Sequence, residues 1–231
     1  LGIAQQSDKT VALCCTSGTA SLNYAPAIAE AFYQRIPLLI LTADRPVEWI
    51  GQGEGQSIVQ RDVYKNFILG SFELPQDPIN PDEIWSGGRI INEAIDLCTR
   101  IKGPVHINLP LKENLYGTTN LSSAPKLIKD VRGDRKLSTD QLDSLATLWD
   151  SHKKILILCG QAAPSNSLKN ALQIIADDPG VAILTETTAN LCSMAFNGSI
   201  DRVVNALSET EKQSFAPTLL ITCGGAIISK K

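Results

Sequence analysis

Residues 38–46 read Leu-Leu-Ile-Leu-Thr-Ala-Asp-Arg-Pro, and this stretch decides the fold. Its first five residues are apolar or β-branched without alternation, which is typical of a strand buried on both faces of a parallel sheet. The run is far shorter than the roughly 20 apolar residues that cross a bilayer. It ends abruptly in Asp44, Arg45 and Pro46, which predict a polar turn at the carboxyl end of the strand.

Strand-like runs of the same kind recur on both sides of this stretch. Between most of them, apolar residues return with the period of an α-helix, and internal Gly and Pro residues are few. This alternation predicts α/β architecture, with two Rossmann-like three-layer domains and mainly parallel sheets. The expected strands are residues 11–15, 38–42, 105–109, 155–159, 181–184 and 219–223, and the expected helices are residues 24–35, 81–101, 138–151 and 165–177.

The length of 231 residues suits one large or two small domains, at roughly 150 residues per domain. Between residues 118 and 133 the sequence becomes polar and irregular. We therefore expect a first domain over residues 1–120, a linker over 121–137 and a second domain over 138–231.

Composition excludes several classes of protein. Hydrophobic residues make up 43% and charged residues 19%, which is not the composition of a disordered tail. Lys and Arg number 21 against 24 Asp and Glu, and no basic block stands out, so neither nucleic acid nor a membrane is an expected partner. The chain begins with Leu and shows no targeting leader, so we expect it to be a piece of a longer protein.

The six cysteines indicate a reducing compartment. They show no Cys-x-x-Cys spacing, and with the two histidines they form no zinc-ligand pattern. We therefore expect free thiols, a cytoplasmic location and no metal site in this chain.

Candidate functional residues follow the predicted strands, because ligands of open α/β sheets bind outside the carboxyl ends. Thr16, Ser17 and Gly18 follow the first run, where glycine permits a tight turn and helix-start amides can face an anion. A Ser/Thr cap of the next helix is the alternative interpretation. Arg45 follows the second run, and its rigid guanidinium suits a carboxylate or phosphate, unless it forms only a solvated pair with Asp44.

Two further features of the first half have a functional and a structural interpretation. The loop over residues 50–60 carries Gln52, Gln56 and Gln60, and long loops in compact domains are often functional, although an exposed polar loop explains the composition equally well. His106 alternates with apolar residues of its run and is interpreted as a packed core histidine.

The second half offers a weaker candidate site. Three short segments follow their predicted strands and together would form a site suited to a nucleotide. They are residues 159–161, 185–187 and 223–225. Structural turns are the alternative, because the chain has no Gly-x-Gly-x-x-Gly motif.

Several motifs follow one another in a specific order and spacing. They are Thr16-Ser17-Gly18-Thr19-Ala20, residues 38–46, Gly55-Gln56-Ser57-Ile58 followed by Gln60, residues 105–110, and Leu115-Tyr116-Gly117. Together they closely resemble the MenD family, the thiamin-diphosphate-dependent 2-succinyl-5-enolpyruvyl-6-hydroxy-3-cyclohexene-1-carboxylate synthases. The resemblance is strong over residues 1–117. The second half resembles the family's central domain in its pattern, with a recognisable local match at residues 224–231.

The resemblance implies a thiamin-diphosphate-binding fold followed by the family's central-domain fold, both incomplete here. It implies thiamin diphosphate and Mg²⁺ as cofactors of the full-length parent, with the diphosphate and Mg²⁺ site outside this chain. The family's catalytic glutamate would precede Leu1, so the chain alone is expected to be inactive. The implied reaction is decarboxylation of 2-oxoglutarate and addition of the remainder to isochorismate in menaquinone biosynthesis, by a homodimer or higher homo-oligomer.

The resemblance also implies roles for individual residues. Arg45 matches a substrate-gripping arginine, and Gln56 matches a substrate-contacting and catalytic glutamine that reaches the reacting groups. Lys230 matches a lysine that extends to the substrate. The positions that would border the cofactor's aminopyrimidine are Thr16, Ser17 and Gly18.

Two other functions stay open at this point. One is another thiamin-diphosphate-dependent decarboxylase or carboligase, such as an acetolactate-synthase-like protein, and the other is a non-catalytic nucleotide-binding module. The sequence also departs from the family at Glu54-Gly55, where some members carry Ala-Asn, so the resemblance gives Glu54 no role.

Overall fold

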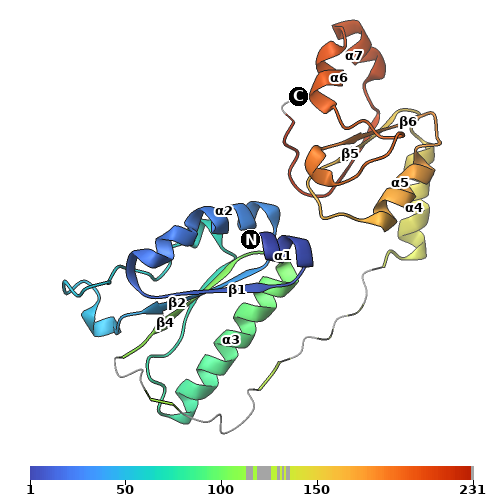
Figure 1. The fold of residues 1–231 in the computed structure, drawn as a ribbon. Coiled ribbons are helices and arrows are strands. Elements are labelled where there is room, and N and C mark those ends of the chain that lie inside the picture. The colour runs from blue at the N-terminus through green and yellow to red at the C-terminus, as the bar shows by residue number, and fades with distance from the viewer. Residues whose placement is uncertain (113–116, 119–125, 129–130, 132, 134–135, 230–231) are drawn as a thin grey trace. The chain divides into compact units, whose positions relative to one another are not determined.

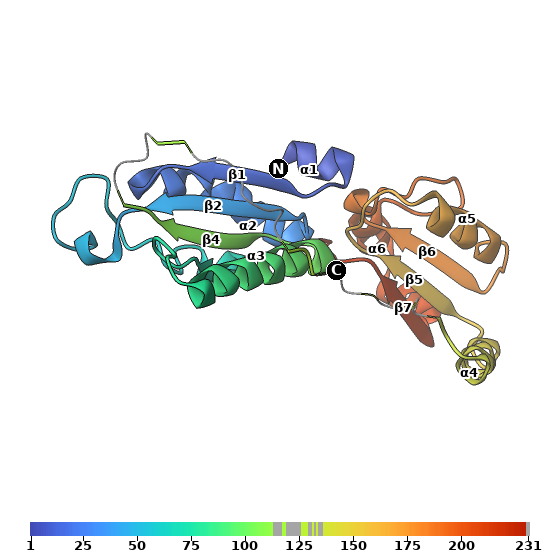
Figure 2. The same ribbon diagram turned by 90° about the horizontal axis from the view of Figure 1, so that it is seen from below.

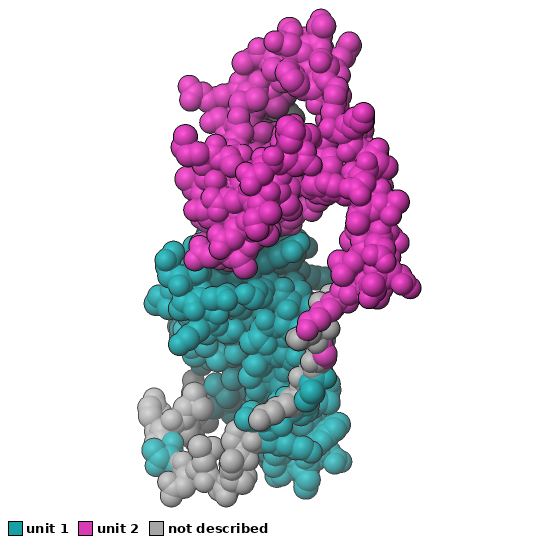
Figure 3. Space-filling model, turned by 90° about the vertical axis from the view of Figure 1, so that its right-hand side faces the viewer, with its two compact units in different colours: residues 1–131 teal, residues 132–231 magenta. Residues whose placement is uncertain are grey.

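The computed structural model describes residues 1–231 except 113–116, 119–125, 129–130, 132, 134–135 and 230–231 (Figure 1). It divides into two units, Leu1–Val131 and Arg132–Lys231, which Figure 3 colours teal and magenta. The division falls within residues 121–137, several of which lie outside the described residues. Each unit combines a parallel sheet with helices, which confirms the predicted α/β class.

Unit 1 (Leu1–Val131) is built on a sheet of four parallel strands in the order β1-β2-β4-β3. Strands β2 and β4 are central, and the side chains of Leu38, Ile40, Val105 and Ile107 are at most 2% exposed. The strands are β1 (Val11–Cys15), β2 (Leu38–Asp44), β3 (Gly70–Glu73) and β4 (Val105–Pro110).

Helices cover both faces of this sheet, with α2 (Ala25–Gln34) on one side and α3 (Pro81–Ile101) on the other (Figures 1 and 2). A short helix, α1 (Gly2–Ser7), lies on the same side as α2. Two apolar cores result. One contains Ile28 and Ala31 of α2 with Leu38 and Ile40 of β2, and the other contains Ala94 and Cys98 of α3 with Val105 and Ile107 of β4.

The register of the strands brings one row of polar residues together. Thr42 of β2 pairs with Cys15 of β1 and with Asn108 of β4, and Asn108 pairs with Glu73 of β3. Paired residues of neighbouring strands share a face, so these four side chains lie on the face that α2 covers, near the carboxyl ends of their strands.

Unit 2 (Arg132–Lys231) contains three parallel strands in the order β6-β5-β7. Its core joins Ile155, Ile157 and Ile183 of the sheet to Leu172 of a helix. The strands are β5 (Ile155–Cys159), β6 (Val181–Thr185) and β7 (Leu219–Cys223), and the helices are α4 (Thr139–Asp150), α5 (Asn166–Ile175), α6 (Ile200–Ala206) and α7 (Glu209–Phe215).

Some features of the fold differ from the sequence-based expectations. The strands β1 and β7 are not buried on both faces, because they lie at the edges of the described sheets, where Cys14 and Leu220 are exposed. Strand β3 was not predicted, since its four residues contain a single large apolar side chain, Phe72. The short helices α1, α6 and α7 were not predicted either, because six or seven residues are too few to show a helical period.

None of the helices in the described part of the chain has both the length and the apolar character that a membrane span requires.

Replacing Ile40 by Ala tests the importance of the central strand β2. Ile40 is completely buried, so we expect Ile40→Ala to lower the free energy of unfolding by ~2–5 kcal/mol, measured by urea denaturation. Ile79 is 87% exposed, and Ile79→Ala should change that free energy by at most ~0.5 kcal/mol. Equal effects of the two substitutions would contradict the assigned core.

Candidate functional site

Four polar side chains are buried at the carboxyl edge of unit 1. Thr42 and Asp44 come from β2, and Asn108 comes from β4. The fourth, Gln60, comes from the loop that follows β2 and returns over the sheet. All four are at most 3% exposed, so each needs hydrogen-bond partners inside the protein.

The side-chain amide of Gln60 connects three segments of the chain. Its Oε1 accepts a hydrogen bond from the backbone N–H of Gly18 at 2.6 Å. Its Nε2 donates to the carbonyl of Ala43 and to Oδ1 of Asn108, both at 3.0 Å. The turn after β1, the end of β2 and the end of β4 are therefore held by one side chain.

Asn108 and Thr42 extend this network across the sheet. The Nδ2 of Asn108 donates to Oδ2 of Asp44 at 2.8 Å and to Oε2 of Glu73 at 3.3 Å. The hydroxyl of Thr42 donates to Oδ1 of Asn108 at 2.9 Å, and Nε2 of His106 lies 2.7 Å from the same hydroxyl. Since Thr42 has one proton, the hydroxyl must accept from His106, which places the imidazole proton on Nε2.

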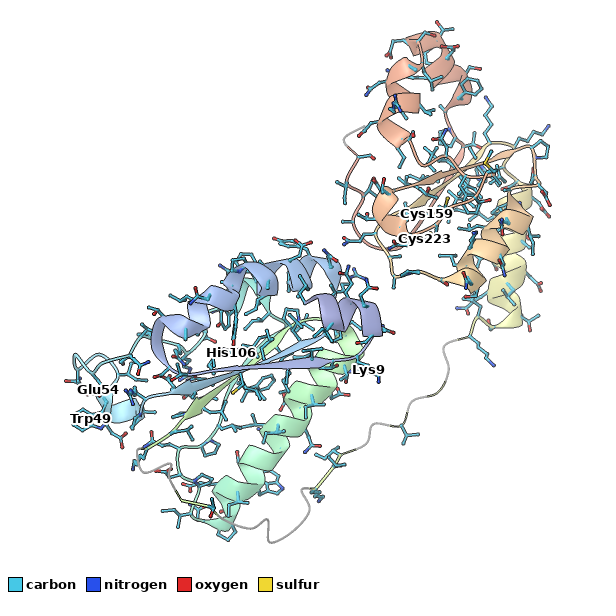
Figure 4. All side chains as sticks on the ribbon, in the orientation of Figure 1. Lys9, Trp49, Glu54, His106, Cys159 and Cys223 are labelled. Carbon is cyan, nitrogen blue, oxygen red and sulfur yellow. The ribbon has the colours of Figure 1, made fainter. Side chains whose placement is uncertain are left out.

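His106 is a neutral histidine in this environment. It is fully buried, and its Nδ1 has no hydrogen-bond partner among the described residues. The rings of His106 and Tyr64 pack edge to face, with their centroids 5.0 Å apart. Burial lowers the pKa of His106 to about 4. The interpretation of His106 as a packed core residue agrees with this burial (Figure 4), although half of its hydrogen-bonding capacity is unused.

Burial also governs the two other ionisable groups of the network. It raises the pKa of Asp44 above its ordinary value, although the hydrogen bonds from Asn108 and from the backbone N–H of Arg45 act in the opposite direction. It raises the pKa of Tyr64 to about 12, and the Tyr64 hydroxyl donates to the carbonyl of Ser21 at 2.5 Å.

Three of the predicted site residues come together next to this network. Nε of Arg45 donates to the carbonyl of Gly55 at 3.2 Å. Gly55 directly precedes Gln56 in the chain. Gly18 has φ +83°, and a Cβ atom there would lie 3.0 Å from the carbonyl carbon and oxygen of Gln56, so only glycine permits this approach. The strands thus place Gly18, Arg45 and Gln56 at one edge, with Gln56 itself exposed and at φ 55°.

The remaining predicted residues have different positions. Thr16 is exposed and Ser17 is buried. Ser17 precedes the 3₁₀ helix Gly18–Tyr24, but its side chain makes no capping hydrogen bond, so the capping interpretation is wrong. Asp44 binds the backbone N–H of Arg45 at 2.8 Å through Oδ1. Lys230 lies outside the described residues.

One buried hydroxyl at this edge has no partner. Oγ of Ser57, the residue after Gln56, is buried and has no hydrogen-bond partner among the described residues. Leaving such a group unpaired costs about 1–3 kcal/mol.

An apolar cavity of about 300 Å³ lies elsewhere on unit 1 and does not contain these residues. It is formed by the ends of β3 and β4 and the first half of α3. Its lining includes Leu74, Pro78, Ile84, Ile91, Leu109 and Leu111.

The carboxyl edge of unit 2 uses its backbone amides internally. The amides of Gly160, Gln161 and Gly225 donate to carbonyls at 2.7–3.0 Å. The amides of Ile228 and Ser229 donate to Oε1 of Glu186 at 2.9 and 2.8 Å. Burial raises the pKa of Glu186, but these hydrogen bonds lower it more, so the net direction is downward. Among the described residues, no group of three or more His, Cys, Asp or Glu could hold a metal ion.

The chain is similar to known proteins, first through a family model and then through relatives that match its whole length. Residues 1–64 match the family model of the thiamine pyrophosphate enzyme, N-terminal TPP binding domain. Along its whole length the chain is 41% identical to the 2-succinyl-5-enolpyruvyl-6-hydroxy-3-cyclohexene-1-carboxylate synthases of Flavobacterium johnsoniae and Flavobacterium psychrophilum, and 39% identical to that of Porphyromonas gingivalis. The chain spans about two fifths of each of these relatives, 40–41% of their length.

The match of residues 1–64 to this family model and the similarity of the whole chain to these synthases place it in the thiamine pyrophosphate enzyme class. Within that class, the chain belongs to the family of 2-succinyl-5-enolpyruvyl-6-hydroxy-3-cyclohexene-1-carboxylate synthases.

Sequence reasoning gave little weight to several residues of this edge. In the sequence, Gln60 stands with Gln52 and Gln56 as a polar loop residue, and Asn108 stands only within the motif of residues 105–110. Gln52 and Gln56 are exposed, whereas Gln60 is completely buried. The available signal was the register, which places Asn108 beside Thr42 once the strands are paired.

Changing Gln60 to Glu tests the central amide. The new carboxylate oxygen would face the carbonyl of Ala43 and Oδ1 of Asn108, both of them acceptors. We expect a loss of at least ~1–3 kcal/mol in the free energy of unfolding at pH 7, measured by urea denaturation. Gln52→Glu is the matched control, because Gln52 is exposed in the same loop, and it should be nearly neutral. Unchanged stability in Gln60→Glu would contradict the network.

The neutral state of His106 predicts a pH dependence of stability. An unfolded histidine gains a proton below about pH 6.5, whereas folded His106 stays neutral down to about pH 4. The contribution of His106 is therefore complete above pH 6.5, and as the pH falls from 6.5 toward 4 it declines by up to about 1.4 kcal/mol per pH unit. Urea denaturation at pH 7, 6 and 5 should show a steeper decline for the unmodified chain than for His106→Gln. Equal slopes would mean that folded His106 takes up the proton.

Proposed function

We propose that the protein containing this chain decarboxylates 2-oxoglutarate and joins the four-carbon remainder to isochorismate, as a thiamin-diphosphate- and Mg²⁺-dependent transferase of menaquinone biosynthesis. The observation that carries the proposal is the convergence of Gly18, Arg45 and Gln56 at the carboxyl edge of unit 1. The names of the relatives, which match the chain over its whole length, support the same activity.

The residues at this edge fit the pyrimidine part of thiamin diphosphate. A flat ring with nitrogen donors and acceptors needs polar partners on a rigid base, and the close backbone contact between Gly18 and Gln56 supplies such a base beside polar side chains. Thr16, Ser17 and Gly18 would border the ring. When bound, the cofactor accepts the electron pair left by departing CO₂. We assign the diphosphate and Mg²⁺ to no described residue of this chain, since these contain no group of metal ligands.

Arg45 is proposed to hold a carboxylate of the substrate. Its Nε bond to the Gly55 carbonyl fixes the direction of the side chain. A guanidinium presents five N–H donors in a planar fork, which matches the two oxygens of a carboxylate. Both proposed substrates carry two carboxylates, so a fixed guanidinium would orient them against the cofactor and Gln56.

We also propose that the protein is a cytoplasmic homodimer or higher homo-oligomer. Helix α3 exposes Ile84, Trp85 and Ile95, which are 57%, 64% and 42% accessible. Exposed apolar side chains on one helix support an interaction surface of this kind.

The activity is tested with the intact protein, isochorismate, 2-oxoglutarate, thiamin diphosphate and Mg²⁺. The expected result is release of CO₂ together with a product that contains both substrates. Release of CO₂ without that product would indicate a simple decarboxylase, and no consumption of either substrate would overturn the proposal.

Replacing Arg45 by Ala tests the substrate contact. The loss of charged hydrogen bonds should lower kcat/KM about 10- to 100-fold, while binding of thiamin diphosphate, measured by calorimetry, stays unchanged. Arg61→Ala is a matched control, because Arg61 is exposed in the same loop region. If kinetics with both substrates are unchanged in Arg45→Ala, the assignment is wrong.

A further inference from the structure

Two cysteines of unit 2 lie side by side at the carboxyl ends of neighbouring strands. Cys159 ends β5 and Cys223 ends β7, and the two residues are direct partners in the parallel register. Their Sγ atoms are 3.4 Å apart (Figure 4). Neighbouring strands are separated by about 4.8 Å, which lies within the range of roughly 4.4–6.8 Å that a disulfide allows between Cα atoms.

The backbone around both cysteines keeps the two thiols together. The amide of Gly160 donates to the carbonyl of Cys223 at 2.8 Å, and the amide of Gly225 donates to the carbonyl of Gln161 at 2.7 Å. A Cβ atom on Gly224 would lie 2.7 Å from the carbonyl oxygen of Gly160, so the turns that follow the cysteines are tightly packed. A disulfide between them requires the two Sγ atoms to approach by about 1.4 Å, from 3.4 Å to the S–S bond length of ~2.0 Å.

From this geometry we propose that Cys159 and Cys223 are a redox-active dithiol that forms a reversible disulfide between β5 and β7. The other thiols lack this arrangement. Cys14 and Cys15 are consecutive in β1 and point to opposite faces of the sheet, and Cys98 is buried in the core against α3 and β4.

The two thiols differ in accessibility, which sets the order of the chemical steps. Cys159 is 1% exposed and Cys223 is partly exposed, so a small oxidant meets Cys223 first. Burial, followed by the contact with Cys223, raises the pKa of Cys159 to about 12. The Cys159 thiol therefore remains protonated while Cys223 reacts.

The oxidant we name is a small-molecule disulfide such as oxidised glutathione. The Cys223 thiolate attacks one of its sulfurs, the S–S bond breaks, and one glutathione leaves as a thiolate. The Cys159 thiol then gives its proton to the solvent, and its thiolate attacks the Cys223 sulfur of the mixed disulfide; the bond between Cys223 and glutathione breaks, and the second glutathione leaves as a thiolate that takes up a proton. Two protein thiols are oxidised to one disulfide, and one glutathione disulfide is reduced to two thiols.

The bond would stiffen the segment that follows β7. Ile228 and Ser229 are held by Glu186, and the turn before them is held by Gly160 and Gln161. A covalent bond at Cys223 would fix the start of that segment to the central strand of the sheet.

The test uses the intact, folded protein equilibrated with oxidised glutathione, alkylated and digested with trypsin without reduction. Cleavage at lysine places Cys159 on the peptide 155–169 and Cys223 on the peptide 213–230. Mass spectrometry should show these peptides linked, with loss of alkylation at both cysteines, and dithiothreitol should restore both separate peptides.

Two variants make the result specific. In Cys159→Ser the linked peptides should be lost and Cys223 should accumulate as its mixed disulfide with glutathione. In Cys192→Ser, which removes an exposed cysteine, the linked peptides should form as before. Absence of the 155–169 and 213–230 pair in folded protein, or its formation only in urea, would overturn the proposal.

Discussion

The buried side-chain amide of Gln60 is the interaction on which the carboxyl edge of unit 1 depends. It is the point where the turn after β1 and the ends of β2 and β4 meet, and its oxygen and nitrogen are both hydrogen-bonded. An amide is suited to this position because it donates and accepts without carrying a charge. Since each partner belongs to a different segment, the Gly55–Ser57 turn and Gly18 keep their mutual position only while Gln60 is in place.

The acidic groups of this edge and its buried histidine are kept apart by neutral side chains. Asn108 and Thr42 separate the acidic side chains of Asp44 and Glu73 from the neutral ring of His106. A protonated histidine would need an additional acceptor at Nδ1, and none is present among the described residues. The side chain of Arg45, in contrast, is only partly buried, and its Nε donates to the carbonyl of Gly55.

Much of the fold was predictable because burial on both faces leaves a continuous apolar run in the sequence. This holds for β2, whereas β4 alternates apolar residues with the buried polar side chains of His106 and Asn108. The apolar runs also identified β1 and β7 as strands although one of their faces is exposed. The site was less predictable. Arg45 and Gly18 stand next to apolar runs and could be chosen by position, but Gln60 differs from Gln52 only in burial, which results from tertiary packing rather than from local sequence.

The two units hold their carboxyl edges by different means, and this difference bears on what each can bind. In unit 1, side chains such as Gln60 make the connections. In unit 2, several amides after β5 and β7 donate to carbonyls, and those of Ile228 and Ser229 donate to the carboxylate of Glu186. Each unit also holds one buried hydroxyl without a partner among the described residues, that of Ser57 in unit 1 and that of Thr188 in unit 2. Phosphates are bound through backbone amides. A phosphate that used the amides of Ile228 and Ser229 would therefore have to displace the carboxylate of Glu186, which accepts from both.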